Sequence, residues 1–193
     1  FLVLLITTFA PSVNAANYSL QVIIPRASGT GPDASHPTIS IYHRIFWAYP
    51  LIAYEIQAAV IGGKPPFVYS LPSGAPSGMT INATTGIITW TATAQGTSAG
   101  PITFRVVDAE ATTVDTTWSI SVDQTRFKFI NADYAGTEAG TFAQPYNTLS
   151  DMNAIGNNFI IYLRAATATY NFRSTGSYHH GGSLGQFRYV NRF

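Results

Sequence analysis

The chain has 193 residues, of which 10% are charged, with a formal net charge of +1 and no cysteine. The weak charge argues against a nucleic-acid-binding protein, because such a protein needs a basic face to neutralise phosphates. The lack of cysteine excludes a disulfide framework, although a chain of this length can bury a core in one or two small domains without crosslinks.

The first ten residues, FLVLLITTFA, are almost wholly apolar and uncharged. Val13 and Ala15 follow with the spacing that a signal peptidase requires, so residues 1–15 are predicted to be a signal peptide. The apolar run is too short for a membrane span, which takes about 20 residues, and a buried N-terminal strand is the alternative. We expect a secreted or cell-surface protein with no membrane span in its mature chain, which would start at Ala16. Because the initiating Met and the basic n-region are missing, we expect the signal peptide to be truncated at its N-terminus.

Short strands separated by turns are predicted for the first two thirds of the chain. Residues 16–37 are expected to be a lead-in segment, in which Leu20 to Ile24 could form a first strand. From Thr38 onwards, runs rich in Val, Ile, Thr and aromatic residues are separated by Gly, Pro and Asn turns, without sustained helical periodicity. The expected strands lie within residues 38–49, 54–63, 67–71, 79–82, 86–90, 102–108 and 116–122. This pattern predicts an all-β fold with a β-sandwich over residues 38–125.

Two of these runs alternate between apolar and polar residues, so that one face of each is expected to enter the core. The expected core residues are Ile102, Phe104 and Val106 in one run, and Trp118, Ile120 and Val122 in the other. Trp90 and Trp118 are interpreted as core residues, with stacking on a ligand as the alternative. Asn82 to Gly86 (NATTG) is predicted to be a turn, with Gly86 at a positive φ.

A family resemblance extends over about residues 42–123. Its elements are a Gly-Gly-x-Pro-Pro-aromatic turn, a Pro-x-Gly-Met segment, a Thr-Gly turn and a strand that ends in Val-x-Asp. The matching residues are Gly62, Gly63, Pro65, Pro66, Phe67, Tyr69, Ser70, Leu71, Pro76, Gly78, Met79, Ile81, Asn82, Thr85, Gly86, Ile88 and Asp108. This segment resembles bacterial Ig-like, cadherin-like repeats, and the resemblance implies a spacer or adhesion module.

Cadherins bind calcium between repeats through clustered acidic motifs, and the sequence SVDQTRF lacks the linker motif of that type. The weak calcium candidates are Asp108, Glu110, Asp115 and Asp123. A hard cation needs several converging oxygens, so solvated loop carboxylates are the favoured interpretation. We expect no other cofactor.

The residues after Arg126 differ in character from the sandwich. FKFI and FIIYL are predicted strands, and residues 145–155 between them are a predicted helix. Thr148 is its expected N-cap, with Asp151 three residues further on, close to a capping box.

A second resemblance covers about residues 127–172. It rests on Gly136, Thr137, Glu138, Gly140, Thr141, Pro145, Tyr146, Thr148, Leu149, Ile161, Leu163 and Tyr170. This run resembles the opening of right-handed parallel β-helix domains of the pectate-lyase-like class, with Ala168 as a departure from the usual Gly. The resemblance implies that residues 126–193 form an N-terminal cap and the first coils of an incomplete β-helix. Because a solenoid coil is stable only beside its neighbours, we expect the protein to continue beyond Phe193.

No catalytic or cofactor-binding residue is predicted within the chain. His179 and His180 are adjacent, so on a strand they would point to opposite faces and rarely serve one metal. The carboxylates of Asp133, Glu138 and Asp151 are expected to be structural groups of the cap. A nucleophile elbow, a phosphate loop and a dinucleotide fingerprint are absent from the sequence.

Two functions are consistent with these observations. The first is a secreted modular protein, with an Ig-like spacer or adhesion module before a β-helix that binds or processes extracellular polysaccharide or cell-surface glycans. If the whole protein were an enzyme, it would be a polysaccharide lyase or a glycoside hydrolase. The alternative is a non-catalytic cell-surface adhesin or structural protein.

Overall fold

The computed structural model describes residues 18–33, 35, 37–148, 151, 158–164, 166–167 and 187–190. The predicted signal peptide, His179, His180 and most of the predicted helix over residues 145–155 lie outside the described residues.

Strands joined by turns make up the described chain, together with two 3-10 helices (η1 and η2) of three residues each. The elements in chain order are β1 (Gln21–Ile24), η1 (Arg44–Phe46), β2 (Trp47–Ala48), β3 (Ala53–Gln57), β4 (Ala59–Ile61), β5 (Val68–Ser73), β6 (Thr80–Ile81), β7 (Ile87–Thr91), β8 (Ser98–Val107), β9 (Thr113–Val122), η2 (Gln124–Arg126), β10 (Phe127–Ile130), β11 (Ile160–Arg164) and β12 (Phe187–Val190). The predicted all-β fold is confirmed.

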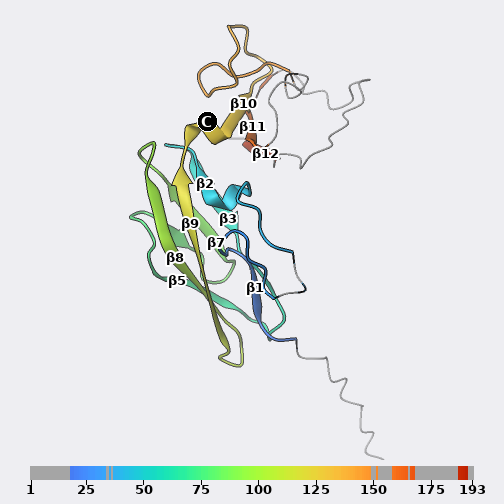
Figure 1. Ribbon diagram of the computed structural model, residues 1–193, viewed down its shortest axis with the longest axis vertical. Helices are drawn as coiled ribbons and strands as arrows, with labels where there is room; N and C mark the ends of the chain where they lie inside the picture. The colour runs from blue at the N-terminus through green and yellow to red at the C-terminus, as the bar shows by residue number, and fades with distance from the viewer. Residues whose placement is uncertain are drawn as a thin grey trace, which may run out of the picture.

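Two sheets form a sandwich in the first part of the chain (Figure 1). One has the order β2-β9-β8-β5 and the other the order β3-β7-β6. The core between them contains the side chains predicted from the alternation in β8 and β9, each with 0 to 2% of its surface exposed: Ile102, Phe104, Val106, Trp118, Ile120 and Val122. This burial confirms the predicted inward faces of β8 and β9. Each apolar side chain buried in this way stabilises the fold by roughly 1.5–3 kcal/mol.

The expected strand within residues 38–49 is reduced to β2, which pairs in parallel with β9. The segment before it is the 3-10 helix η1, which His43 caps at its N-terminus by accepting the Ile45 N–H on Nδ1 at 3.3 Å. The adjacent residues Ile45 and Phe46 are both buried. A strand would place neighbouring side chains on opposite faces, which is why these residues fit a helical turn instead.

The lead-in segment contributes a strand to the sandwich. β1 pairs antiparallel with β4, and Leu20 and Val22 are buried in the same core as β8 and β9. The single run predicted over residues 54–63 is interrupted at Ala58, whose N–H donates to the Gly86 carbonyl at 2.9 Å. As a result, β3 pairs with β7 while β4 pairs with β1.

The predicted turn between β6 and β7 is confirmed. Asn82 Oδ1 accepts the N–H groups of Thr84 and Thr85 at 3.0 and 2.9 Å. Gly86 has a φ of +71°. A Cβ atom at Gly86 would approach the Tyr69 ring to 3.2 Å, so glycine is favoured here by both backbone conformation and packing.

A separate three-stranded sheet follows the sandwich. Its order is β10-β11-β12, and both pairs are parallel. The strands predicted at FKFI and FIIYL are confirmed as β10 and β11. Of the predicted helix, the described residues show that the Thr148 N–H and hydroxyl both donate to Asp151 Oδ2, at 3.1 and 2.6 Å. The sheet alone does not establish a β-helix.

The two glycines Gly86 and Gly96 allow the packing of the turn to be tested. Gly96 has a φ of +76°, and a Cβ atom there would meet nothing within 4 Å. Gly96→Ala is therefore expected to lower the free energy of unfolding by about 1–2 kcal/mol, because of the backbone conformation alone. Gly86→Ala should lower the free energy of unfolding by about 1 kcal/mol more than Gly96→Ala does, because the new methyl group also crowds Tyr69. Urea denaturation measures both, and equal costs for the two variants would contradict tight packing of the turn on Tyr69.

Candidate functional site

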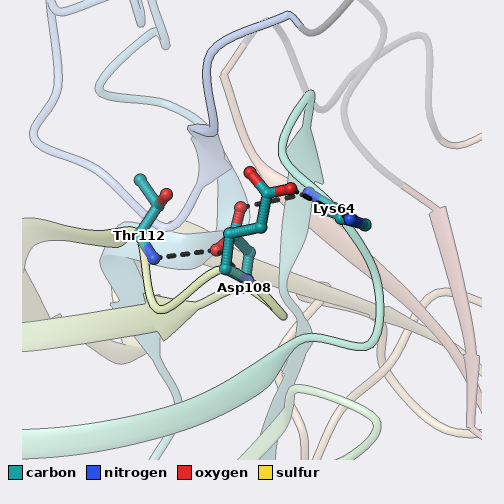
Figure 2. A network of polar contacts seen from close by, with 4 residues as sticks. Lys64, Asp108 and Thr112 are labelled. Carbon is teal, nitrogen blue, oxygen red and sulfur yellow. Dashed lines mark hydrogen bonds and ion pairs between the residues drawn. The ribbon is translucent and has the colours of Figure 1, made fainter. Parts of the chain in front are cut away.

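Asp108 is the polar centre of the turn between β8 and β9 (Figure 2). Its Oδ1 accepts the N–H groups of Glu110 and Thr112 at 3.0 and 2.8 Å, and its Oδ2 accepts the Lys64 N–H at 3.1 Å. The Ala109 N–H donates a hydrogen bond to the Lys64 carbonyl at 2.8 Å. The carboxylate therefore ties the Gly-Gly-Lys-Pro-Pro loop to the β8–β9 hairpin.

The charge of Asp108 is favoured by this arrangement. Burial by itself would raise the pKa of the carboxyl group, but the N–H donors of Thr112, Lys64 and Glu110 outweigh it, and the pKa lies below its usual value. Three acceptor positions are occupied by backbone donors, so the role of this carboxylate is to hold the turn.

The other calcium candidates are also engaged, at separate places. Glu110 pairs with Lys64 Nζ at 2.9 Å, and Asp115 accepts two hydrogen bonds from Arg105 at 2.8 and 2.7 Å. Asp123 follows the C-terminal end of β9 and caps η2, where its Oδ1 accepts the Thr125 N–H at 2.9 Å. Within the described ranges, no group of three or more His, Asp or Glu side chains is placed to hold a metal ion, so these four carboxylates do not converge.

A cavity of about 390 Å³ lies between β1, the loop 26–32 and residues 114–117 of β9. The Arg26 side chain lines it with only 6% of its surface exposed. Its buried Nε has no hydrogen-bond partner among the described residues, and the same is true of Oε1 of Gln21, which also lines the cavity. Buried polar groups are usually paired, and Nε1 of Trp118 in the sandwich core is another buried atom without a hydrogen-bond partner among the described residues.

The electrostatics of the cavity are set by few groups. Burial lowers the pKa of Arg26, and the charge of Asp33 acts in the opposite direction. Gln21 Nε2 donates to Asp33 Oδ2 at 3.2 Å, which leaves the Gln21 carbonyl oxygen as the unpaired end of the amide. Sequence reasoning missed this site, although one signal was present: Arg26 is the only charged residue among the first 32.

Aromatic side chains gather where the sandwich meets the parallel sheet. We call the set packed there the junction cluster: Tyr49, Ile52, Phe127, Phe129, Phe142, Ile160 and Tyr162. The Tyr49 ring, from the sandwich, meets Phe127 and Phe129 edge-on at centroid distances of 5.5 and 5.0 Å. Phe129 in turn stacks on Tyr162 at 5.6 Å. Burial within this cluster raises the pKa of Tyr49.

The segment between the two units is short and held in place (Figure 1). Asp123 donates its N–H to the Ala48 carbonyl at 3.1 Å, and the Gln124 N–H donates to Gln95 Oε1 at 2.8 Å. The guanidinium of Arg126 lies 4.6 Å from the centroid of the Trp47 ring. The connection is thus hydrogen-bonded to the sandwich where η2 begins, and Arg126 contacts the sandwich where η2 ends.

Two carboxylates of the predicted cap hold neighbouring segments. Asp133 accepts the N–H and the hydroxyl of Thr167, at 2.6 and 3.0 Å, and Asp151 accepts the two hydrogen bonds from Thr148. Both contacts agree with a structural role. Trp118 is 2% exposed and belongs to the core, while the half-buried Trp90 donates its indole N–H to the Ser77 carbonyl at 3.3 Å.

Residues 46–123 match the model of the family described as "Putative Ig domain". The match supports an Ig-like domain over this segment. The match begins within η1 and ends after β9, so it confirms the predicted Ig-like part and gives no support to a β-helix in the residues after it.

Comparison with solved structures gives weak similarities to two proteins of Bacteroides fragilis NCTC 9343. One is titled a putative alpha-galactosidase/melibiase, with 13% identity and a TM-score of 0.35 over 62% of this chain and 26% of that chain. The other is titled a putative alpha-galactosidase, with 15% identity and a TM-score of 0.38 over 76% of this chain and 43% of that chain. The chain spans less than half of either protein, and similarities at this level carry no functional argument. No curated protein matches the chain.

The described residues contain no helix of the length and hydrophobicity that a membrane span requires.

The N–H contacts of Asp108 predict a pH dependence. The pKa of the carboxyl group is about 3.8 in the unfolded chain and lower in the folded one, so its contribution to stability is present above about pH 4 and is lost as the pH falls through the folded-state pKa. Asp108→Asn should therefore be less stable than the natural chain at neutral pH and should lose less stability on acidification.

Urea denaturation at a series of pH values measures this difference. A residual slope is expected in the variant from Asp115, because the hydrogen bonds from Arg105 lower the pKa of that carboxyl group. Asp108→Glu keeps the charge, but its longer side chain moves the carboxylate away from the three N–H donors. This variant should therefore also be less stable than the natural chain at neutral pH. Identical acid slopes for Asp108→Asn and the natural chain would contradict the role given to the three N–H donors.

Proposed function

We propose that this Ig-like domain is a rigid spacer in a secreted modular protein, and that it presents a following parallel β-helix to extracellular polysaccharide. The observation that carries the proposal is the junction cluster, in which Tyr49 and Ile52 of the sandwich pack against Phe127, Phe129 and Tyr162 of the parallel sheet.

A flexible tether between domains is exposed, polar and crossed by few contacts. The connection between β9 and β10 has the opposite character. Residues 123–126 contain neither Gly nor Pro, their backbone is bonded to Ala48 and Gln95, and Arg126 covers the Trp47 ring. Bending at this point would break these bonds and expose aromatic surface, so the two units should move as one body.

The parallel sheet supports the β-helix part of the proposal. Neighbouring strands succeed one another in chain order, as successive coils of a solenoid do. Phe127 pairs with Ile160, which lies 33 residues further along the chain, and Ile161 pairs with Phe187, which lies 26 residues further along. Parallel pairing requires long crossovers of this kind, and the resemblance over residues 127–172 assigns them to a pectate-lyase-like cap and coil.

Export is supported by the sequence of residues 1–15, and the polysaccharide partner is supported by the β-helix resemblance. In the adhesin or structural alternative, the Ig-like domain has the same spacer role and only the β-helix differs in function. The discriminating observation is the sequence of further coils, if the protein has them: charged residues repeated on one face at coil spacing favour a lyase or hydrolase, and uniform Asn, Gly, Val and Thr coils favour adhesion.

Removal of the Tyr49 ring tests the rigid connection. Tyr49→Ala should destabilise the chain by about 1–3 kcal/mol, because each aromatic pair contributes about 0.5–1.5 kcal/mol beyond its buried area. It should also loosen the junction. Since the chain has no cysteine, cysteines introduced at Thr84 and Ala135 can each be spin-labelled specifically. Pulsed electron–electron double resonance then measures the distance between the two labels, one on each unit.

We expect one narrow distance distribution for the natural chain and a broad one for Tyr49→Ala. Tyr18→Ala removes the same side chain from a position with 77% of its surface exposed, and should leave the distribution narrow. A broad distribution in the natural chain would refute the rigid-spacer proposal.

A further inference from the structure

A second cavity of the sandwich, of about 230 Å³, lies against the outward face of the sheet β2-β9-β8-β5. It is enclosed by the loop at Ala27, by Trp47 of β2, by Pro101 of β8 and by the outward side chains around Ser119 of β9. Strands from one sheet and a loop from the lead-in segment therefore meet at this place, which the spacer role does not use.

A row of hydroxyl groups forms the β9 wall of this cavity. Thr117, Ser119 and Ser121 line it, and they alternate along the strand with the inward Trp118 and Ile120. Their hydroxyls therefore lie on one face, about 7 Å apart. Thr117 and Ser119 are exposed and Ser121 is half-buried, so this wall is accessible from solvent. None of the three hydroxyls is hydrogen-bonded to another described residue, and each can both donate and accept.

Apolar surface lies beside the hydroxyl row. Trp47 pairs with Ser121 between β2 and β9, which places the indole ring on the same face of the sheet as the hydroxyls. The indole N–H already donates to the Ile41 carbonyl at 2.8 Å, so the Trp47 side chain offers the cavity apolar surface only. Ile41, which also lines the cavity, is 47% exposed, and Pro101 is exposed as well.

The chemistry of the lining restricts the ligand. None of the described side chains that line the cavity is charged, so an ion entering it would lose water without gaining a charged partner. A wholly apolar ligand would cover the hydroxyls and leave them without hydrogen bonds. A neutral sugar matches both parts of the lining, because its hydroxyls donate and accept while its C–H groups are apolar. The volume lies below the range of drug-sized sites, about 300–1,000 Å³, which limits the occupant to about one sugar unit.

We propose that this cavity binds one unit of a neutral saccharide, with ring hydroxyls bonded to Thr117, Ser119 and Ser121 and the C–H groups of the ring against Trp47 and Ile41. In the proposed function the β-helix contacts the polysaccharide, whereas this site places a saccharide on the sandwich itself. The site does not depend on the junction cluster. A broad distance distribution between spin labels would leave it standing, and a failure to bind sugars would leave the spacer role standing.

Titration of the full chain by NMR tests the proposal. The probes are the methyl pyranosides of β-D-glucose, β-D-galactose and α-D-mannose. We expect at least one of them to shift the resonances of residues lining the cavity, with a Kd on the order of 1–10 mM. Cyclohexanol has a ring with a single hydroxyl, and methyl β-D-glucuronide carries a carboxylate. Both should bind at least about threefold more weakly than the best neutral pyranoside.

Two variants of the hydroxyl row assign the contacts. Thr117→Val and Ser119→Ala should each weaken binding about threefold to tenfold, the usual effect of losing one neutral hydrogen bond. Thr113→Val is the matched control, because it removes a hydroxyl from the same face of β9 outside the cavity lining. It should bind as the natural chain does. All three positions are exposed, so the midpoint of thermal unfolding should stay close to that of the natural chain.

Four outcomes would overturn the proposal. The first is that none of the three pyranosides shifts a resonance of the cavity, as expected for a hollow that holds only water. The second is that cyclohexanol or the glucuronide binds as well as the neutral pyranosides. The third is undiminished binding by both Thr117→Val and Ser119→Ala. The fourth is an equal loss of binding in Thr113→Val, which would place the contact elsewhere on the sheet.

Discussion

The burial of the inward face of β9 is the constraint on which the rest of the structure depends. Trp118, Ile120 and Val122 on this face are 0 to 2% exposed, and they pack in one core with the inward residues of β8. β9 also pairs with both β8 and β2. β1 packs into the same core, the Thr116 hydroxyl of β9 donates to the Pro25 carbonyl at 2.6 Å, and the C-terminal end of β9 is directed towards β10 (Figure 1).

The connection to the second unit depends on that direction. Because β9 ends at Val122 and is continued at once by the capped η2, the chain enters β10 without a free linker. The sandwich then supplies Tyr49 to a cluster that otherwise consists largely of side chains from the parallel sheet. In the spacer role proposed above, a domain joined in this way would fix the position and orientation of the next unit, which a Gly/Ser-rich linker would not do.

The buried polar groups of the sandwich fall into two kinds. Asp108 is surrounded by backbone donors and stabilises one turn. Arg26 and Gln21 retain unpaired atoms in a shared cavity. Since the net stability of a domain is small, the paired carboxylate of Asp108 is explained by its contribution to the fold.

Local patterns in the sequence were sufficient for the inward faces of β8 and β9, for the Asn82–Gly86 turn and for the Ig-like character of the sandwich. Each of these depends on alternation or turn chemistry between residues close together in the chain. Tertiary structure alone decided the pairing of β1 with β4, the break at Ala58, the helical turn at His43 and the burial of Arg26. These features join residues far apart in the sequence, such as the cavity-lining Gln21 and Asp115, and no local pattern specifies which distant surface a strand will meet.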